Sequence, residues 1–289
     1  MILIRSQGQL GNQLFLLAAV LRERRPREIV IFVGFTDLAR VVSLWRLGFH
    51  LPLPHSFDRK VKRVFKKLFN FHPLSCECVI RQESGHATVQ RKRSCRWPLI
   101  FEFGLCQSEK MAPLDPVGKL VSHDATTRKR SSAARSRLIS VGVDPERFAF
   151  LHIRLGDYAH FNVLGFTPVL PARWYVNVVA RLREAEPDLP VVVFSDQIDA
   201  ARELFADSDG FFYFPFDDVE SFFAMSMASH GVLSASTFSW WAARIARTQH
   251  PDGIFVAPMY WMGFRAGQWF PTPEIQASFL EYASVDRGS

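Results

Sequence analysis

The segment "FAFLHIRLGDY" (residues 148–158) begins like a buried strand and ends in side chains that could hold an anion. Apolar residues run to Leu151, and His152, Arg154 and Asp157 then follow within six positions. Side chains two apart on a strand share a face, so His152 and Arg154 should point the same way. Arginine offers a fixed fork of donors to a phosphate, and Asp157 would orient that fork or take a proton. The alternative for Arg154 is a structural salt bridge.

Two further segments place polar or flexible residues after a predicted strand. In "QGQLGNQ" (7–13), Gly8 and Gly11 would let backbone N–H groups approach a ligand ahead of a helix N-terminus. A tight strand-to-helix turn is the alternative interpretation. In "VFSDQ", Ser195 and Asp196 follow an apolar run. Asp196 would either cap the next helix or accept hydrogen bonds from a nucleotide base or ribose.

The segment "SASTFSWW" (234–241) gathers hydroxyl groups where a predicted strand turns into a helix. Ser236 is suited to be the N-cap. The hydroxyls of Thr237 and Ser239, with the free N–H groups of the first turn, would form a cradle for an anion. At least one of the two tryptophans should pack between helix and sheet. Together with the arginine of the first segment, this helix start predicts a pyrophosphate site in the second half of the chain.

Continuous apolar runs alternate with helical patterns along most of the chain. This alternation is typical of parallel strands with helices covering both faces of the sheet. The carboxyl ends of such strands meet at one edge, where ligands bind. We therefore predict an α/β fold of two Rossmann-like domains, at 1–140 and 141–289. A closing helix is expected over "PEIQASFLEYAS" (273–284), and packing of that helix back on the first domain is left open.

The first half contains segments whose patterns are harder to interpret. "FTDLARVVSLWRLG" (35–48) predicts a helix closed by Gly48, whereas residues 70–140 show no clear period. We expect loops and short elements there, with an inter-domain link near 125–145. "RKVKRVFKKLF" (59–69) has an apolar face and a basic face. One interpretation is a solvated helix of the first domain, and the other is contact with an anionic membrane surface.

The composition excludes a disordered chain. The 289 residues are 48% apolar and 22% charged, with a net charge of +7 and an excess of lysine and arginine in the first half. That excess indicates an anionic partner, but the sequence carries no nucleic-acid-binding signature, so no nucleic acid is expected. Without an apolar run of about 18 residues or a leader, we expect a cytoplasmic protein, with peripheral contact at the inner face of the membrane left open. The four cysteines form no C-x-x-C pair and are expected to be reduced thiols rather than metal ligands.

The segments "GQLGNQLF", "HIRLGDY", "VFSD" and "STFSWWAA", in this order, resemble glycosyltransferase family 11, the α-1,2-fucosyltransferases. They resemble more distantly the α-1,6- and protein O-fucosyltransferases. The resemblance covers most of the chain and implies a GT-B fold, with an acceptor-side domain (1–140) and a donor-binding domain (141–289) facing each other across a cleft. It also implies inverting transfer of L-fucose from GDP-β-L-fucose to a glycan hydroxyl, O2 of a galactose-type sugar, without a metal or other cofactor. The implied context is O-antigen or polysaccharide biosynthesis, and a lipid-linked glycan acceptor is left open.

The resemblance also implies roles for individual residues. Arg154 would contact the β-phosphate of the leaving GDP in place of a cation, and His152 and Asp196 would recognise guanosine. Asn12 would reach across the cleft toward the sugar and phosphate. Asp157 is one candidate for the general base, beside a residue of the first domain or attack without a base. The implied GDP-sugar site consists of Gly11, Asn12, His152, Arg154, Ser195, Asp196, Ser236, Thr237, Phe238 and Ser239.

The sequence departs from the family pattern at four positions. Leu155 stands where a second arginine is usual, and Gln197 replaces a second carboxylate. Leu16 and Arg244 replace a glutamine and a tryptophan. These departures leave another GDP-linked 6-deoxyhexose open as the donor, and a non-catalytic GDP-sugar-binding protein would share every donor-site residue. A metal-dependent transferase would need a D-x-D pair, which "DSD" (207–209) offers only at the wrong edge of the predicted sheet.

Overall fold

The computed structural model describes residues 2–52, 77–83, 86–89, 99–103, 106–112, 125–205, 210–213 and 217–286. The chain forms two compact units, Met1–Thr127 and Arg128–Ser289. Helix α5 (Ala125–Ser140) crosses the division between them. The boundary predicted at 140/141 lies at the C-terminal end of this helix, so much of the expected link near 125–145 is helical.

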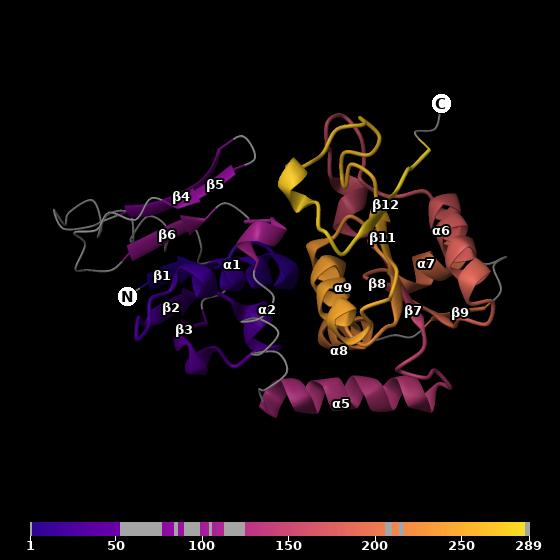
Figure 1. The fold of residues 1–289 in the computed structure, drawn as a ribbon, viewed down its shortest axis with the longest axis horizontal. Coiled ribbons are helices and arrows are strands. Elements are labelled where there is room, and N and C mark those ends of the chain that lie inside the picture. The colour runs from indigo at the N-terminus through magenta and orange to yellow at the C-terminus, as the bar shows by residue number, and fades with distance from the viewer. Residues whose placement is uncertain are drawn as a thin grey trace. The chain divides into compact units, whose positions relative to one another are not determined.

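The first unit contains, within its described residues, a six-stranded sheet with the order β3-β2-β1-β6-β4-β5 (Figure 1). Neighbouring strands run parallel, except that β4 and β5 are antiparallel. The strands are β1 (Ile2–Arg5), β2 (Val30–Val33), β3 (Gly48–Leu51), β4 (Glu77–Glu83), β5 (His86–Val89) and β6 (Leu99–Phe103). The helical elements are α1 (Leu10–Glu23), α2 (Thr36–Ala39) and 3₁₀ turns at Leu44–Arg46 and Glu109–Met111.

The single helix predicted over residues 35–48 is wrong. Helix α2 is one turn long, the 3₁₀ turn Leu44–Arg46 follows, and Gly48 opens strand β3 instead of closing a helix. Gly48 lies so close to the carbonyl oxygen of Val30 on β2 that a Cβ atom at this position would overlap it. Parallel pairing with β2 therefore overrides the local helical pattern.

The part of the chain that lacked a clear period contributes strands β4, β5 and β6 to the same sheet. The sequence of β4, "ECVIRQE", mixes charged and apolar residues, whereas the buried strands of a parallel sheet read as apolar runs. The short elements expected here are therefore strands of four to seven residues, and the sequence did not identify them as strands of the sheet because most of their pairing partners are distant in sequence. The basic amphipathic segment 59–69 lies outside the described residues.

The second unit is built on a parallel sheet with the order β12-β11-β10-β7-β8-β9, counted over its described residues (Figure 1). Its strands are β7 (Ala149–Ile153), β8 (Val191–Ser195), β9 (Phe211–Tyr213), β10 (His230–Val232), β11 (Phe255–Pro258) and β12 (Glu281–Ala283). Its helices include α6 (Ala172–Ala185), α7 (Ile198–Leu204), α8 (Asp218–Met225) and α9 (Thr237–Gln249). The strand–helix alternation predicted from Phe148 to residue 258 is confirmed.

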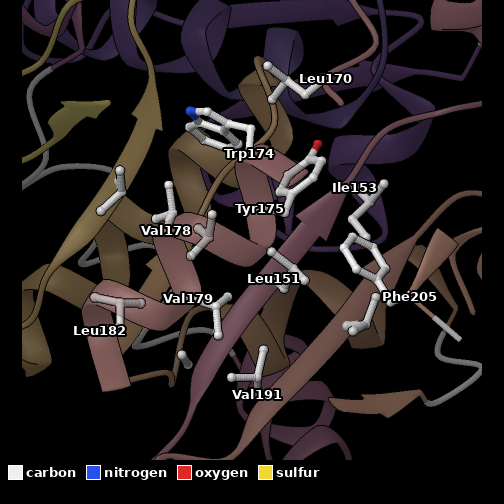
Figure 2. Packing of buried hydrophobic residues seen from close by; sticks show 14 of the residues in the cluster. Leu151, Ile153, Leu170, Trp174, Tyr175, Val178, Val179, Leu182, Val191 and Phe205 are labelled. Carbon is white, nitrogen blue, oxygen red and sulfur yellow. The ribbon is translucent and has the colours of Figure 1, made fainter. Parts of the chain in front are cut away.

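The core of the second unit holds strand β7, which leads into Arg154 and Asp157. All five residues of β7 are buried. Figure 2 shows Leu151 of this strand among side chains of α6 such as Tyr175 and Val179, with Val191 of β8 nearby. Each buried side chain of this size stabilises the fold by about 1.5–3 kcal/mol. The end of β7 is therefore a rigid support for the residues that follow it.

The closing helix predicted over residues 273–284 is wrong. Pro273–Ile275 forms a 3₁₀ turn, in which the Thr272 hydroxyl accepts a hydrogen bond from the backbone N–H of Glu274 at 3.0 Å. The chain then enters β12, which pairs in parallel with β11. The last strand thus completes the sheet of its own unit. Because residues 273–284 do not form a helix, the expectation that a terminal helix packs on the first domain no longer applies. Among the described residues, no helix is both long enough and apolar enough to cross a bilayer.

Candidate functional site

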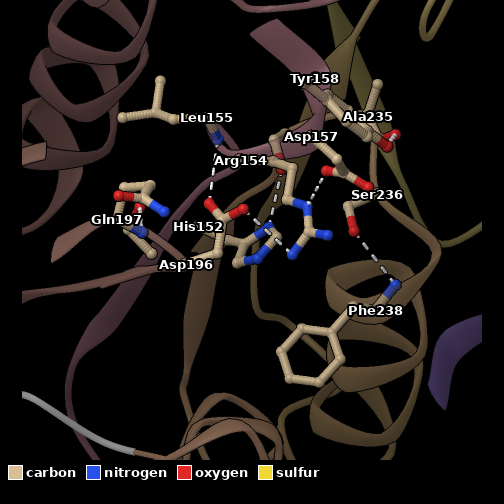
Figure 3. A network of polar contacts seen from close by, with 12 residues as sticks. His152, Arg154, Leu155, Asp157, Tyr158, Asp196, Gln197, Ala235, Ser236 and Phe238 are labelled. Carbon is tan, nitrogen blue, oxygen red and sulfur yellow. Dashed lines mark hydrogen bonds and ion pairs between the residues drawn. The ribbon is translucent and has the colours of Figure 1, made fainter. Parts of the chain in front are cut away.

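Three of the polar segments meet at one edge of the second sheet. Strand β7 pairs with β8 on one side and with β10 on the other, and all three run parallel. Their carboxyl ends therefore lie at the same edge, which is where ligands bind in α/β sheets. The structure brings together the residues after Ile153, after Phe194 and after Val232 (Figure 3).

Arg154 lies between two carboxylates at this edge. Its Nε donates to Asp157 Oδ1 at 2.9 Å, and its Nη1 lies 3.3 Å from Asp196 Oδ2 (Figure 3). Burial opposes the charge, but the hydrogen bond to Asp157 and the nearby Asp196 outweigh it, so the pKa of Arg154 lies above its ordinary value. The Arg154 side chain is 18% exposed. It is a permanent, oriented cation that a ligand can still reach.

Asp196 joins the loops that follow β7 and β8. Its Oδ1 accepts a hydrogen bond from the backbone N–H of Leu155 at 3.0 Å. A Cβ atom on Gly156 would lie 2.5 Å from Asp196 Oδ2, so glycine allows this close approach. Helix α7 begins after Gln197 and has no side-chain cap, which removes the interpretation of Asp196 as its N-cap. Ser195 accepts a hydrogen bond from the Gln197 backbone N–H at 3.1 Å.

His152 is a buried neutral histidine. Its side chain is nearly inaccessible, and its Nδ1 lies 2.7 Å from the Ser234 hydroxyl. Burial, with a smaller effect of the Arg154 charge, lowers the pKa of His152 from 6.5 to about 3. The ring lies 5.7 Å from that of Phe238 at the start of α9. His152 therefore connects β7 to the turn before α9 without adding charge.

The turn before α9 is held by its own hydroxyl groups. Ser236 is the N-cap, as predicted, and its Oγ accepts a hydrogen bond from the Phe238 N–H at 3.4 Å. Ser239 is fully buried and donates to the Ser236 carbonyl at 3.1 Å, so it holds the turn and is not exposed to a ligand. Thr237 and Phe238 are partly exposed. The two tryptophans that follow are fully buried, which confirms the packing interpretation for both.

Tyr158 and Ser234 belong to this network although the sequence did not single them out. The Tyr158 hydroxyl donates to the Ala235 carbonyl at 2.7 Å, which ties the turn after β7 to the turn after β10. Burial raises the pKa of Tyr158. The Arg154 guanidinium lies 5.9 Å from the centre of the Tyr158 ring. Because Tyr158 directly follows Asp157 in the sequence, its position next to a predicted site residue could have identified it as a candidate.

The remaining predicted site residues, Gly11 and Asn12, belong to the first unit. They lie in the first turn of α1, where Gly11 is buried and Asn12 partly exposed. Gly8, with φ of 64°, precedes them, and a Cβ atom there would overlap Asn12 Nδ2. The Gln107 side chain donates through Nε2 to Asn12 Oδ1 at 2.9 Å. Gln107 was not predicted as a site residue.

The described residues contain no cluster of three or more His, Cys, Asp or Glu side chains arranged to hold a metal ion. The aspartates at 207 and 209, which offered the D-x-D alternative, lie outside the described residues.

Comparison with known families assigns the chain as a whole. The family model described as glycosyl transferase family 11 matches residues 49–265, which is most of the chain and extends across both units. The chain belongs to glycosyl transferase family 11.

Relatives of known role show how far this similarity extends. The chain is 29% identical over 116 residues to the O-antigen biosynthesis glycosyltransferase WbnK of Escherichia coli, covering 38% of each protein. It is 31% identical over 117 residues to an α-1,2-colitosyltransferase of Escherichia coli, covering 38% of this chain and 40% of that protein. Galactoside α-(1,2)-fucosyltransferase 2 of Rattus norvegicus is 24% identical over 253 residues, or 85% of this chain and 67% of that protein. The matches to the two bacterial relatives thus span about two fifths of their length.

Solved structures confirm the fold. A glycosyl transferase family 9 protein from Veillonella parvula superposes with a TM-score of 0.53 at 10% identity, covering 99% of this chain and 88% of that one. The NodZ α-1,6-fucosyltransferase co-crystallised with GDP gives a TM-score of 0.51 at 10% identity, covering 88% and 94%. Together with the two parallel-sheet units, these matches confirm the predicted GT-B class.

Proposed function

We propose that this family 11 member transfers L-fucose from GDP-β-L-fucose to a glycan hydroxyl, with inversion and without a metal ion. The proposal rests mainly on the position of Arg154, a permanent cation that Asp157 and Asp196 hold at the carboxyl edge of the second sheet. The proposal is also supported by the similarity to a galactoside α-(1,2)-fucosyltransferase, which extends over 85% of the chain.

In the proposed reaction the acceptor oxygen attacks C1 of the fucose in line with the bond to the β-phosphate. The bond from the acceptor oxygen to C1 forms while the bond from C1 to the phosphate oxygen breaks, and its electron pair leaves with GDP. Arg154 stabilises the charge that develops on the pyrophosphate, the role a metal ion has in other transferases. The permanent charge of Arg154 suits this role because the cation needs no proton supply at neutral pH.

The start of α9 is the second proposed contact with the pyrophosphate. The N–H groups of the first helical turn and the partial positive charge of a helix N-terminus favour an anion. Ser236 and Ser239 fix the backbone of this turn through the hydrogen bonds described above. We assign Thr237 the direct contact because it is partly exposed, whereas the Phe238 N–H already donates to Ser236 Oγ.

We further propose that Asp196 and the neutral imidazole of His152 recognise guanosine. Asp196 is already held by Leu155 and Arg154, so it would present a fixed carboxylate edge. Asp157 is engaged by Arg154, and we assign it the positioning of that guanidinium. A residue of the first domain, or loss of the acceptor proton to solvent after attack, would then complete the proton balance.

A second donor has specific support. One bacterial relative is named an α-1,2-colitosyltransferase, and Leu155 and Gln197 depart from the pattern of the fucosyltransferases at the edge of this site. Another GDP-linked deoxyhexose is therefore the alternative donor. For the acceptor, we propose O2 of a galactose-type sugar in a polysaccharide precursor, including its lipid-linked form, since one relative is named for O-antigen biosynthesis.

The test is transfer from GDP-fucose to a panel of β-galactosides in EDTA, with the linkage of the product read by NMR. An α-1,2-linked fucoside formed at the same rate with and without EDTA is the expected result. Transfer that stops in EDTA and returns with a divalent ion would reject the metal-independent mechanism. GDP binding without transfer to any acceptor, or to water, would favour the non-catalytic binding protein.

A further inference from the structure

We propose that Gln107 is a positioning residue of this reaction, acting through Asn12. The proposal rests on the function proposed above and on the substrate contact that the family resemblance implies for Asn12. Gln107 Nε2 donates to Asn12 Oδ1 at 2.9 Å. Because this bond occupies the oxygen of the Asn12 carboxamide, it leaves Nδ2 as the end that can donate to an anionic or hydroxyl oxygen.

The two residues follow neighbouring strands of one sheet. Asn12 lies in the first turn of α1, the helix that follows β1, and Gln107 lies in the loop that follows β6. Strands β1 and β6 pair in parallel (Figure 1). Their meeting point is therefore the carboxyl edge of the first sheet, the edge at which ligands bind in this class of fold. Gly8 leaves room for the other end of the Asn12 carboxamide, since a Cβ atom at this position would overlap Nδ2.

The loop that carries Gln107 is held in a specific conformation. Cys106 is buried and adopts φ of 48°, a left-handed conformation that is costly for a residue with a side chain. Its carbonyl accepts a hydrogen bond from the Ser108 N–H at 2.8 Å. Arg22 in the last turn of α1 donates to the Lys110 carbonyl at 2.7 Å, which ties the 3₁₀ turn after Gln107 to this helix. Backbone strain of this kind concentrates at functional sites.

The environment of Gln107 disfavours a purely structural role. Its side chain is 6% exposed, and its Oε1 has no hydrogen-bond partner among the residues that the structure describes. A buried acceptor without a partner destabilises a fold, so an apolar side chain would serve packing alone at least as well. What this carboxamide supplies is the bond to Asn12.

The experiment is a double-mutant cycle on the full chain with Gln107→Leu, Asn12→Ala and both together. The readout is kcat for GDP release from GDP-fucose, with water or β-galactosides as acceptor, beside the melting temperature. We expect Gln107→Leu to lower kcat by up to about 10²-fold without lowering the melting temperature, because it frees Asn12 to rotate. The double variant should be no slower than Asn12→Ala alone.

The control is Gln249→Leu in the second unit, which removes a similar hydrogen bond from a glutamine to the Ser226 carbonyl, 2.8 Å in length. Its kcat should match the wild type. Near-normal kcat for Gln107→Leu, or losses that multiply in the double variant, would overturn the inference while leaving the proposed function intact. A wild type that neither binds GDP-fucose nor releases GDP from it would overturn both. If the wild type binds GDP-fucose without turnover, the affinity for GDP-fucose is measured for the same variants. Additive losses of binding free energy in the double variant would again reject the role of Gln107.

Discussion

Arg154 is the residue on which the proposed chemistry depends most. Replacing it with alanine should lower kcat for fucose transfer by about 10²–10³-fold, because the pyrophosphate would lose a charged partner in the transition state. Arg154→Lys should recover part of the rate, since it keeps the charge but loses the planar fork that bonds to Asp157. Steady-state kinetics in EDTA measures both variants.

The matched control for Arg154 is Arg181→Ala, which removes an exposed arginine whose Nη2 lies 3.9 Å from Glu281 Oε2 in the same unit. Surface ion pairs of this kind contribute little, so kcat should stay within about twofold of the wild type. Equal rates for Arg154→Ala and Arg181→Ala would contradict the leaving-group role.

His152 gives a pH dependence of stability with a definite sign. Its pKa is lowered from 6.5 to about 3, first by burial and then by Arg154. Between these values the unfolded chain binds a proton that the native protein does not, so the free energy of unfolding falls as pH drops through this window. The slope from one such group is at most about 1.4 kcal/mol per pH unit.

The variant that isolates this effect is His152→Gln, which keeps a polar partner for Ser234 but does not titrate. Urea unfolding from about pH 7 down to about pH 4 should show a weaker decline for the variant than for the wild type. Identical slopes would show that His152 does not carry the effect.

Sequence reasoning at this scale identified residues whose partners are close along the chain. Arg154 and Asp157 stand three apart, and their hydrogen bond follows from one turn after a strand. The contact between His152 and Ser234 spans 82 positions, and that between Asn12 and Gln107 spans 95. Such pairs depend on which strands are neighbours in a sheet, and a single sequence does not give strand order.

At the scale of elements, the start of α9 is tested by its cap. Ser236→Ala removes the acceptor for the Phe238 N–H and should destabilise the protein by about 0.5–2 kcal/mol. Because the same turn is proposed to bind the pyrophosphate, GDP affinity should fall as well. Calorimetry with GDP and urea unfolding measure the two effects on one variant.

Helix α8 supplies the comparison for that cap. Asp217 is its N-cap and forms a capping box with Glu220, so Asp217→Ala should cost a similar amount of stability. That helix start has no assigned role in the site, and GDP affinity should not change. Loss of GDP affinity in both variants would show that the effect is general destabilisation, and loss in neither would remove the α9 turn from the site.

Elements were predictable where local pattern and tertiary context agree. The strands of the second unit from β7 to β11 are apolar runs bounded by turns, and they form as expected. Strand β3 and strand β12 each replace part of a predicted helix because they complete a sheet by pairing with β2 and β11. The energy of that pairing comes from a neighbour, so the local helical pattern was misleading.

At the scale of the molecule, the chain is two α/β units of glycosyl transferase family 11. The fold class was predictable because the strand–helix alternation recurs in both halves. The meeting of the polar segments in the second unit was predictable in outline because the carboxyl edge of a parallel sheet gathers the residues that follow its strands. The assignment of the donor itself rests on the site in the second unit.

The most direct test of that assignment is calorimetric titration of the purified protein with GDP in EDTA, beside the same titration with UDP and ADP. We expect GDP to bind at least about tenfold more tightly than either, a difference of about 1.4 kcal/mol, without any divalent ion. That result would support a guanine-selective, metal-independent pyrophosphate site. Equal binding of all three nucleotides, or binding of none, would contradict it.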